Sequence, residues 1–392
     1  MKLLSAHVAT RDTQTLWDDI STASGSLGCI ACVDRAICGG AHKKASFYNC
    51  TDYCHCPDKS SCDLVCRGNP ASYVARVREV GGLSLMNAKR APTIDVDRLP
   101  SMIPWIEHKS ARQNALMFPI VAVPLYKLID PENGSVRYSD RESLAKQFAI
   151  DPRVRLVLSG VGRDPNLERY WATANPPELL AQLQKLDISL ITTPNFSVLS
   201  DVPRTDNLHA MKRSLNAFVD MAEAGLPTAL HINARTERDY QRWAEVVGER
   251  DEVQCLAVEF ATGAGRGDRI KWHVRQLREL AETVNRPIRL IIRGGSRMME
   301  DLRLSFSSVT LIDTNAFSKT RSRKKAFFTT AGNLIWQSSP TSVGEPLDDL
   351  LQHNVSTLHS HHIYLERFHS DRRIAATLGF DRSTDYRYRK SV

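Results

Sequence analysis

From about residue 115 onward, short apolar runs alternate with longer segments whose apolar residues recur with a helical period. Near-continuous apolar runs, such as Leu256–Phe260, are typical of strands that are covered on both faces. The segments 177–186, 208–224 and 272–284 between them have the spacing of amphipathic helices. The apolar runs are Phe118–Tyr126, Val154–Val161, Ile188–Thr193, Pro227–Ile232, Val253–Phe260, Pro287–Ile292 and Val309–Ile312.

Strands that alternate with helices in this order predict a parallel sheet joined by right-handed crossovers. The spacing of the runs fits either a (β/α) barrel or an open doubly wound sheet. Polar residues repeatedly follow the runs, and barrel active sites are assembled at the carboxyl ends of many strands. We therefore expect an α/β protein with a TIM-like (β/α) barrel. An eighth strand is not evident, so Asn333–Gln337 or Gly82–Leu85 would close the barrel, or the barrel is incomplete.

The pattern divides the chain into four parts. Residues 1–72 are expected to form a cysteine-rich module and 73–114 a proline-containing connector. Residues 115–345 would form the barrel, and 346–392 a C-terminal helix followed by a basic tail. The helix is expected over Leu347–Phe368, and we expect its four histidines, His353, His359, His361 and His362, to be surface residues.

The composition is that of an ordinary globular protein, because 42% of the 392 residues are hydrophobic and 24% are charged. No stretch approaches the roughly 18 continuous apolar residues of a membrane span, so we expect no membrane partner. The N-terminus lacks the apolar core of a secretory signal, which predicts a cytoplasmic protein. The net charge of +8 favours polyanionic partners such as nucleic acid, although a mildly basic enzyme has a similar balance.

Eight of the nine cysteines lie between Cys29 and Cys66, and this density indicates metal ligands. Thiolates bind soft metals and clusters because sulfur is polarisable and deprotonates readily beside a cation. The uneven spacing favours iron–sulfur clusters of the 4Fe-4S type, and the tight pairs at each end leave structural zinc as an alternative. A disulfide scaffold is the third interpretation. The expected metal ligands are Cys29, Cys32, Cys38, Cys50, Cys54, Cys56, Cys62 and Cys66.

Two short motifs resemble those of known families. The segment Cys29–Gly40, with the pattern C-x2-C-x5-C-G-G, resembles the start of the auxiliary iron–sulfur cluster domain of radical-SAM maturases. That family has a further cysteine soon after the glycines, where this chain has Ala41, so the resemblance implies Cys50 or a later cysteine as the fourth ligand. Thr193–Ser197 resembles the Thr-Pro-(Asp/Asn)-Phe-Ser strand end of an uncharacterised bacterial and phage family, which implies no particular activity.

Residues capable of acid–base chemistry follow three of the predicted strands. Glu259 and Asp313 lie at strand ends among apolar neighbours, where burial raises a carboxyl pKa toward neutrality. Either group could then act as an acid, a base or a nucleophile. His231 is a candidate base or orienting donor, and the alternative is a core histidine with backbone partners.

The strand ends also provide candidate substrate ligands. The turn that begins at Arg293 is the best phosphate candidate, because its glycines let backbone N–H groups approach an anion. A tight turn that needs glycine for a positive φ is the alternative. Asparagines would orient the substrate, and a basic segment near residue 320 would contact phosphates. The candidate ligands are Asn195, Asn233, Arg293, Gly294, Gly295, Ser296, Lys319 and Arg321.

Three functions remain open from these features. The leading hypothesis is an enzyme with a metal or iron–sulfur module that acts on a phosphate-bearing substrate, either nucleic acid or a nucleotide. The second is a non-catalytic nucleic-acid-binding subunit of a defence or mobile-element complex, which would also have a protein partner. The third is a redox enzyme that uses the clusters for electron transfer.

Overall fold

The computed structural model describes residues 79–130, 132–172, 176–198, 204–265, 267–329 and 333–377, excluding the side chains of 204–206 and 367–377. The expected metal ligands between Cys29 and Cys66 and the basic tail lie outside the described residues. The segment expected as the barrel is described almost throughout.

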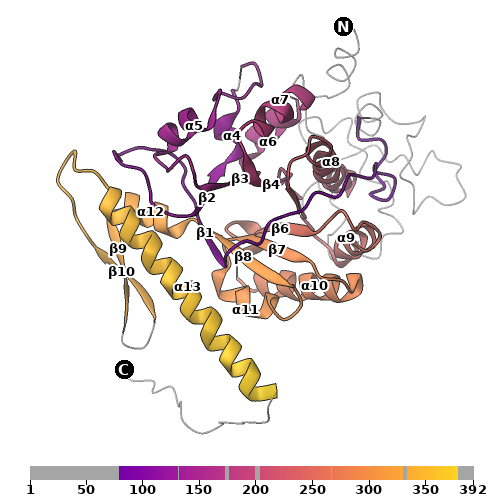
Figure 1. Ribbon diagram of the computed structural model, residues 1–392. Coiled ribbons are helices and arrows are strands. Elements are labelled where there is room, and N and C mark those ends of the chain that lie inside the picture. The colour runs from indigo at the N-terminus through magenta and orange to yellow at the C-terminus, as the bar shows by residue number, and fades with distance from the viewer. Residues whose placement is uncertain are drawn as a thin grey trace, which may run out of the picture.

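Eight parallel strands form one barrel-like sheet (Figure 1). They are β1 (Met102–Pro104), β2 (Ile120–Pro124), β3 (Arg155–Ser159), β4 (Ile188–Thr192), β5 (Thr228–His231), β6 (Cys255–Glu259), β7 (Arg289–Arg293) and β8 (Ser308–Asp313). Their order is β1-β8-β7-β6-β5-β4-β3-β2. The ring nearly closes, because Trp105, directly after β1, bridges to Ala122 of β2. The prediction of a TIM-like barrel is therefore confirmed.

Helices connect the successive strands from β2 onward and surround the ring, whereas the connection from β1 to β2, which is described throughout, has no helix (Figure 1). They are α4 (Leu125–Leu128), α5 (Arg141–Phe148), α6 (Asp164–Trp171), α7 (Pro176–Gln184), α8 (Arg204–Glu223), α9 (Glu237–Glu249), α10 (Arg269–Val284), α11 (Met299–Leu302) and α12 (Asn315–Arg321), with short 3-10 helices at Gly263–Gly265 and Ser296–Met298. Local signals set their starts: Thr236 and Asp239 form a capping box before α9, and Asp140 caps α5. In the part of the chain that the structure describes, no helix is both long and apolar enough to cross a membrane.

The strand that completes the ring, β1, lies in the segment that was expected to be a connector. It pairs with β8, with Met102 opposite Leu311, and all of its residues are buried. Three residues are too few to stand out as an apolar run, which explains why the sequence pattern did not reveal this strand.

Both candidates for the eighth strand are wrong. Gly82–Leu85 forms no strand. Asn333–Gln337 overlaps β10 (Leu334–Ser338), which pairs with β9 (Lys324–Phe328) as an antiparallel hairpin outside the barrel. In the two described strands of the hairpin only Ala326 is buried and the other residues are partly or fully exposed, whereas the barrel strands are buried almost throughout.

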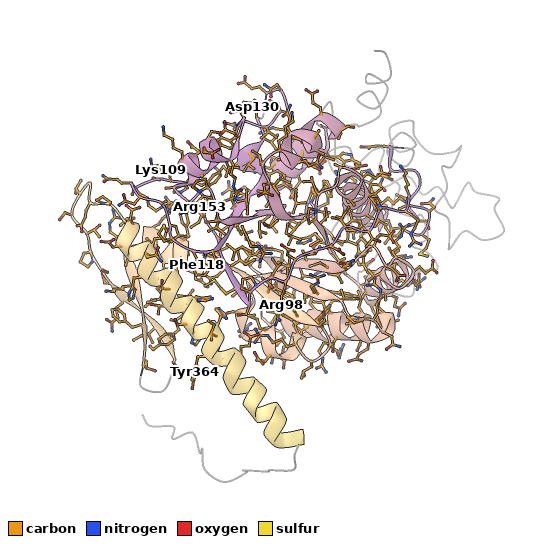
Figure 2. All side chains as sticks on the ribbon, viewed as in Figure 1. Arg98, Lys109, Phe118, Asp130, Arg153 and Tyr364 are labelled. Atoms are coloured by element: carbon orange, nitrogen blue, oxygen red, sulfur yellow. The ribbon has the colours of Figure 1, made fainter. Side chains whose placement is uncertain are left out.

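Two clusters of buried apolar side chains stabilise the barrel, and Figure 2 shows side chains throughout the space between strands and helices. Ala257 of β6 and Ile291 of β7 belong to the cluster that includes β1 and β2 across the ring. Their neighbours along each strand cluster with the surrounding helices α9 and α10, so Ala257 and Ile291 point into the barrel. Side chains alternate along a strand, and Glu259 and Arg293 lie two residues after Ala257 and Ile291. Their side chains thus also point into the barrel. The sheet therefore brings these two polar residues to the mouth of the barrel.

The chain after the barrel forms α13 (Asp348–Thr377), which contacts α12, β9 and β1 (Figure 1). Asn354 is fully buried there; its side chain accepts from the Ala326 N–H and donates to Thr320 Oγ1 and the Lys324 carbonyl, each at 2.8 Å. The helix is longer than the expected Leu347–Phe368. His362 is buried, so the expectation of four surface histidines is wrong for this residue.

Candidate active site

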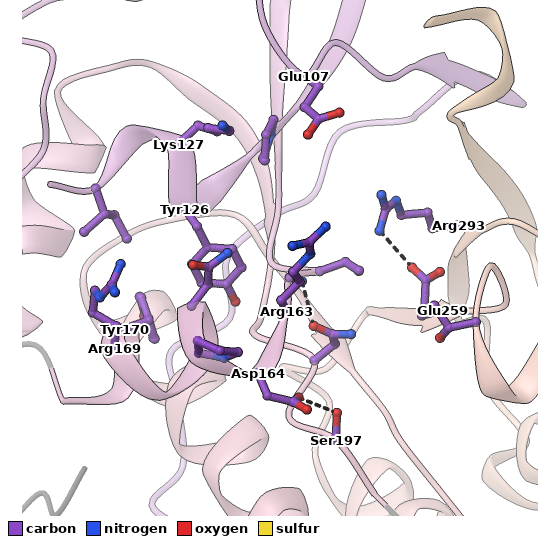
Figure 3. Close-up of a pocket in the computed structure, with 18 of the residues that line it drawn as sticks. Glu107, Tyr126, Lys127, Arg163, Asp164, Arg169, Tyr170, Ser197, Glu259 and Arg293 are labelled. Carbon is purple, nitrogen blue, oxygen red and sulfur yellow. Dashed lines mark hydrogen bonds and ion pairs between the residues drawn. The ribbon is translucent and has the colours of Figure 1, made fainter. Parts of the chain in front are cut away.

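A cleft with a volume of about 1080 Å³ opens at the carboxyl ends of the barrel strands (Figure 3). Its walls come from residues that end or follow β1, β2, β3, β4, β6 and β7, which is the usual place for a barrel active site. The lining residues are Trp105, Glu107, Pro124, Tyr126, Lys127, Ile129, Arg137, Val161, Gly162, Arg163, Asp164, Pro165, Asn166, Arg169, Tyr170, Asn195, Ser197, Glu259, Thr262 and Arg293.

Glu259 is the buried carboxylate of this cleft, with 6% of its surface exposed. Its Oε1 accepts from the Ala261 N–H at 2.8 Å, and its Oε2 lies 3.3 Å from Arg293 Nη1. Burial raises the pKa of the Glu259 carboxyl, and the charge of Arg293 opposes part of this change. A carboxyl in this position can hold or release a proton closer to neutral pH than an exposed glutamate.

Arg293 connects Glu259 to an aromatic ring. Its guanidinium carbon lies 4.6 Å from the ring centroid of Trp105, which follows β1. Stacking on the indole and pairing with Glu259 together restrict the arginine to one place in the cleft. Trp105 was not among the predicted site residues, because the strand that positions it was not predicted.

Cations outnumber anions among the residues lining the cleft. Five arginines and lysines face three carboxylates, so the cleft favours a negatively charged ligand. Figure 3 shows Arg169 at the opposite end of the view from Arg293, with Arg163 between them. The cations are Lys127, Arg137, Arg163, Arg169 and Arg293, and the carboxylates are Glu107, Asp164 and Glu259.

Hydrogen bonds between loops hold one wall of the cleft. Asn195 Oδ1 accepts from the Gly162 N–H at 3.0 Å, and Asp164 Oδ1 accepts from Ser197 Oγ at 2.7 Å (Figure 3). Asn195 thus lines the cleft, as a substrate-orienting residue must. Asn233 Nδ2 donates to the Phe196 carbonyl at 2.6 Å and lies in a smaller chamber next to the cleft.

His231 lies in the barrel interior, with 1% of its surface exposed, and does not line the cleft. Within the described ranges, neither ring nitrogen has a hydrogen-bond partner. Burial, together with the charge of Arg293, lowers the pKa of His231 to about 3. The imidazole is therefore neutral at physiological pH.

The side chain of Asp313 does not line the cleft with Glu259 and Arg293, although Asp313 follows Ile312, the ladder partner of Arg293. Its Oδ1 accepts from the Ala316 N–H at 2.8 Å, and Asn315 Nδ2 donates to its Oδ2 at 3.2 Å. These bonds satisfy donors at the start of α12, which is the role of a helix cap. Asp313 is buried and is not among the residues that line the cleft.

The turn Gly294–Ser296 packs against the end of β6 and does not line the cleft. Gly294 and Gly295 have φ angles of +77° and +69°. A Cβ at Gly294 would lie 2.6 Å from the Ala261 nitrogen, so a side chain cannot fit there. The geometry favours the tight-turn alternative for these glycines, while Arg293 itself enters the cleft.

Lys319 and Arg321 lie on α12, outside the cleft. Burial, together with the positive charges of Arg321 and Lys127, lowers the pKa of His108. The ring of His108 packs on Phe317 of α12 with centroids 5.0 Å apart, and the adjacent Glu107 lines the cleft. Arg321 lies one turn after Phe317 on α12, so a ligand that extends beyond the cleft on this side would meet it.

The predicted residues that the structure brings together are thus Glu259, Arg293 and Asn195. The cations on α6 and its preceding loop were missed, although Arg163 lies only two residues after Val161, the last residue of a predicted strand. Across the described ranges, no group of three or more histidine, cysteine or acidic side chains could hold a metal ion. No protein-family model matches this chain, and no curated protein matches it either.

Proposed function

We propose that the protein is an enzyme that binds a phosphate-bearing substrate, a nucleotide or a nucleic-acid strand, in the cleft at the barrel mouth. Glu259 would be its acid–base group. The observation that carries the proposal is the buried Glu259–Arg293 pair at the base of a cleft in which cations predominate.

The pair supports proton transfer next to a developing negative charge. Burial raises the pKa of Glu259, so this carboxyl is better matched to proton transfer near neutral pH than an exposed one. Arg293, held over the Trp105 ring, is a fixed cation that would stabilise negative charge on the substrate. Both groups would therefore act on the same reacting atoms.

The remaining cations support binding of phosphate. Arginine binds phosphate oxygens through paired N–H groups, and Arg163 and Arg169 both line the cleft. Lys127 and Arg137 also line the cleft and add positive charge to it. A phosphate bound here would place the attached part of the substrate toward Glu259.

The cysteine segment adds a second part to the proposal. We propose that Cys29–Cys66 binds iron–sulfur clusters, with zinc as the alternative; the support is the number and spacing of the thiols. Such thiols remain reduced in the cytoplasm, where we place the protein. Anaerobic purification followed by metal and acid-labile sulfide analysis tests this. Iron with acid-labile sulfide supports clusters, and zinc alone supports structural zinc sites. Metal-free protein without free thiols would show that the cysteines form a disulfide scaffold.

The test of the proposed function combines binding with product formation. The full-length protein is titrated with nucleoside 5′-phosphates and a single-stranded oligonucleotide by calorimetry, and mixtures are analysed for products by mass spectrometry. We expect Glu259→Gln to retain binding and to form no product. Arg163→Gln should weaken binding about tenfold or more, which is the effect of losing one charge-assisted hydrogen bond.

A matched control is available at the other end of β3. Arg153 precedes β3 and is exposed, whereas Arg163 follows β3 and lines the cleft (Figure 2 labels Arg153). Arg153→Gln should therefore leave binding unchanged. Equal losses in the two variants, or wild-type turnover by Glu259→Gln, would show the proposal to be wrong.

A further inference from the structure

A smaller chamber, with a volume of about 240 Å³, adjoins the cleft on the side of α9 and α10. Asn195, Ser197, Glu259 and Thr262 line both spaces, so they form the boundary between them. Glu259 thus lies between the cleft, which we also call the large chamber, and the small chamber. None of the arginines and lysines that we assign to phosphate binding in the cleft lines the small chamber.

A buried histidine in this chamber has a defined proton position. The Tyr240 hydroxyl lies 2.7 Å from His273 Nδ1, and both side chains are buried. Burial raises the pKa of Tyr240, so its hydroxyl keeps its proton. Among the described residues, this proton has no other acceptor, so it is donated to Nδ1. The proton of the neutral imidazole is then on Nε2, which makes His273 a hydrogen-bond donor.

The surroundings of His273 are positively charged. Burial and the charges of Arg235 and Arg269 lower the pKa of His273 to about 4, and both arginines line the chamber. Arg269 is also the first residue of α10, whose first turn has no acidic residue and whose preceding Asp268 makes no side-chain cap. The positive end of the helix dipole therefore adds to the two guanidinium groups. Of the described residues that line the chamber, Glu259 is the only carboxylate.

We propose that this chamber is a second oxyanion site, in which Arg235, Arg269 and His273 Nε2–H bind a group of phosphate size. The assignment of that group to the substrate rests on the function proposed for the cleft. A ligand that fills both chambers carries anionic groups on both sides of Glu259, and the bond between its two parts lies at this carboxylate. The substrate class is therefore a molecule with two separated anionic groups, such as an oligonucleotide segment with two successive phosphates, and not a simple monophosphate.

The experiment follows the His273 ring directly. The full-length protein is labelled with nitrogen-15 histidine, and the His273 signals are identified by their loss in His273→Gln. We expect the pattern of an Nε2–H tautomer at pH 7, which inorganic phosphate shifts in a saturable manner. Arg269→Gln should raise the dissociation constant measured from this shift about tenfold or more. Arg163→Gln, which alters only the large chamber, should leave it unchanged.

Arg275→Gln is the matched control, because Arg275 lies on the same helix, is exposed and pairs with Glu279. It removes the same charge without touching the chamber, so the phosphate-induced shift of His273 should persist. Equal weakening by Arg269→Gln and Arg275→Gln would show only a general charge effect and would overturn the site. A His273 signal that does not respond to phosphate would also overturn it, even where calorimetry detects phosphate in the large chamber, and the proposed function would then stand without it.

Discussion

Glu259 and Arg293 are direct partners in the parallel ladder between β6 and β7, and their side chains form an ion pair of 3.3 Å at the base of the cleft. The backbone register of the barrel therefore fixes the distance between the proposed acid–base group and its cation. A one-residue slip of either strand would turn one of the two side chains toward the surrounding helices. The site thus depends on the sheet more than on the loops around it.

Glu259→Gln should stabilise the fold above neutral pH. Burial raises the pKa of Glu259 in the folded protein, so folding disfavours its ionised form. This destabilisation is absent below the unfolded pKa and grows as the pH rises through the folded pKa. We expect Glu259→Gln to be more stable by roughly 0.5 to 2 kcal/mol above neutrality, with no difference toward pH 4. Denaturant unfolding at a series of pH values measures this, and a pH-independent difference would contradict it.

Gly294→Ala should destabilise the protein and disturb the cleft. The positive φ alone costs about 1 to 2 kcal/mol for alanine, and the new Cβ would overlap the backbone at Ala261. Ala261 N–H donates to Glu259, so the carboxylate should move as well. Gly344→Ala is the control, because Gly344 also has a positive φ but no atom within 4 Å of the added Cβ. Thermal unfolding should show a clearly larger loss for Gly294→Ala; equal losses would mean that the close approach to β6 is unimportant.

Asn354→Ala should loosen the C-terminal helix from the barrel. The substitution leaves the buried Ala326 N–H and the Lys324 carbonyl without their partner, at a cost of about 1 to 3 kcal/mol. Ser356→Ala, at an exposed position on the same helix, should change the unfolding free energy by less than about 0.5 kcal/mol. Hydrogen exchange of β9 should accelerate only in the first variant. Unchanged exchange would show that α13 is held by its apolar contacts alone.

Arg321→Gln should distinguish a nucleic-acid substrate from a nucleotide. Arg321 is exposed on α12, one turn after Phe317, whose ring packs on His108 beside the cleft-lining Glu107. A strand that continues beyond the cleft on this side would place a phosphate next to it. We expect the affinity for a single-stranded oligonucleotide to fall. The slope of log affinity against log salt concentration should decrease by about one, which corresponds to the loss of one phosphate contact. The affinity for a nucleoside monophosphate should stay the same. If neither ligand responds, the substrate ends within the cleft.

The sequence pattern predicted the barrel because each of its longer strands is a near-continuous apolar run. β1 could not be predicted in this way, because its three residues form a strand only by pairing with β8. The same limit applies to Trp105. Its position over Arg293 depends on closure of the ring, which local sequence does not encode.

The alternation of side chains along a strand explains why Glu259, and not Asp313, lines the cleft. Glu259 lies two residues after Ala257, whose side chain points into the barrel, so Glu259 points into the barrel as well. Ile312 belongs to the same cluster as Ala257, so the next residue, Asp313, points outward and binds the start of α12. Because these strands are apolar on both faces, the sequence did not show which residues point inward, and only the packing of the folded barrel separates the two carboxylates. The positions of Arg163, before α6, and of Arg169, on α6, were not predictable either, because tertiary contacts decide them.

The placement of β1 has a consequence for any shortened form of this protein. A fragment that starts after Pro104 would lack the strand that lies between β8 and β2, and both of those strands would become open edges with unpaired backbone groups. Such a fragment should self-associate rather than remain a monomer. The smallest part of the chain that folds on its own must therefore include β1.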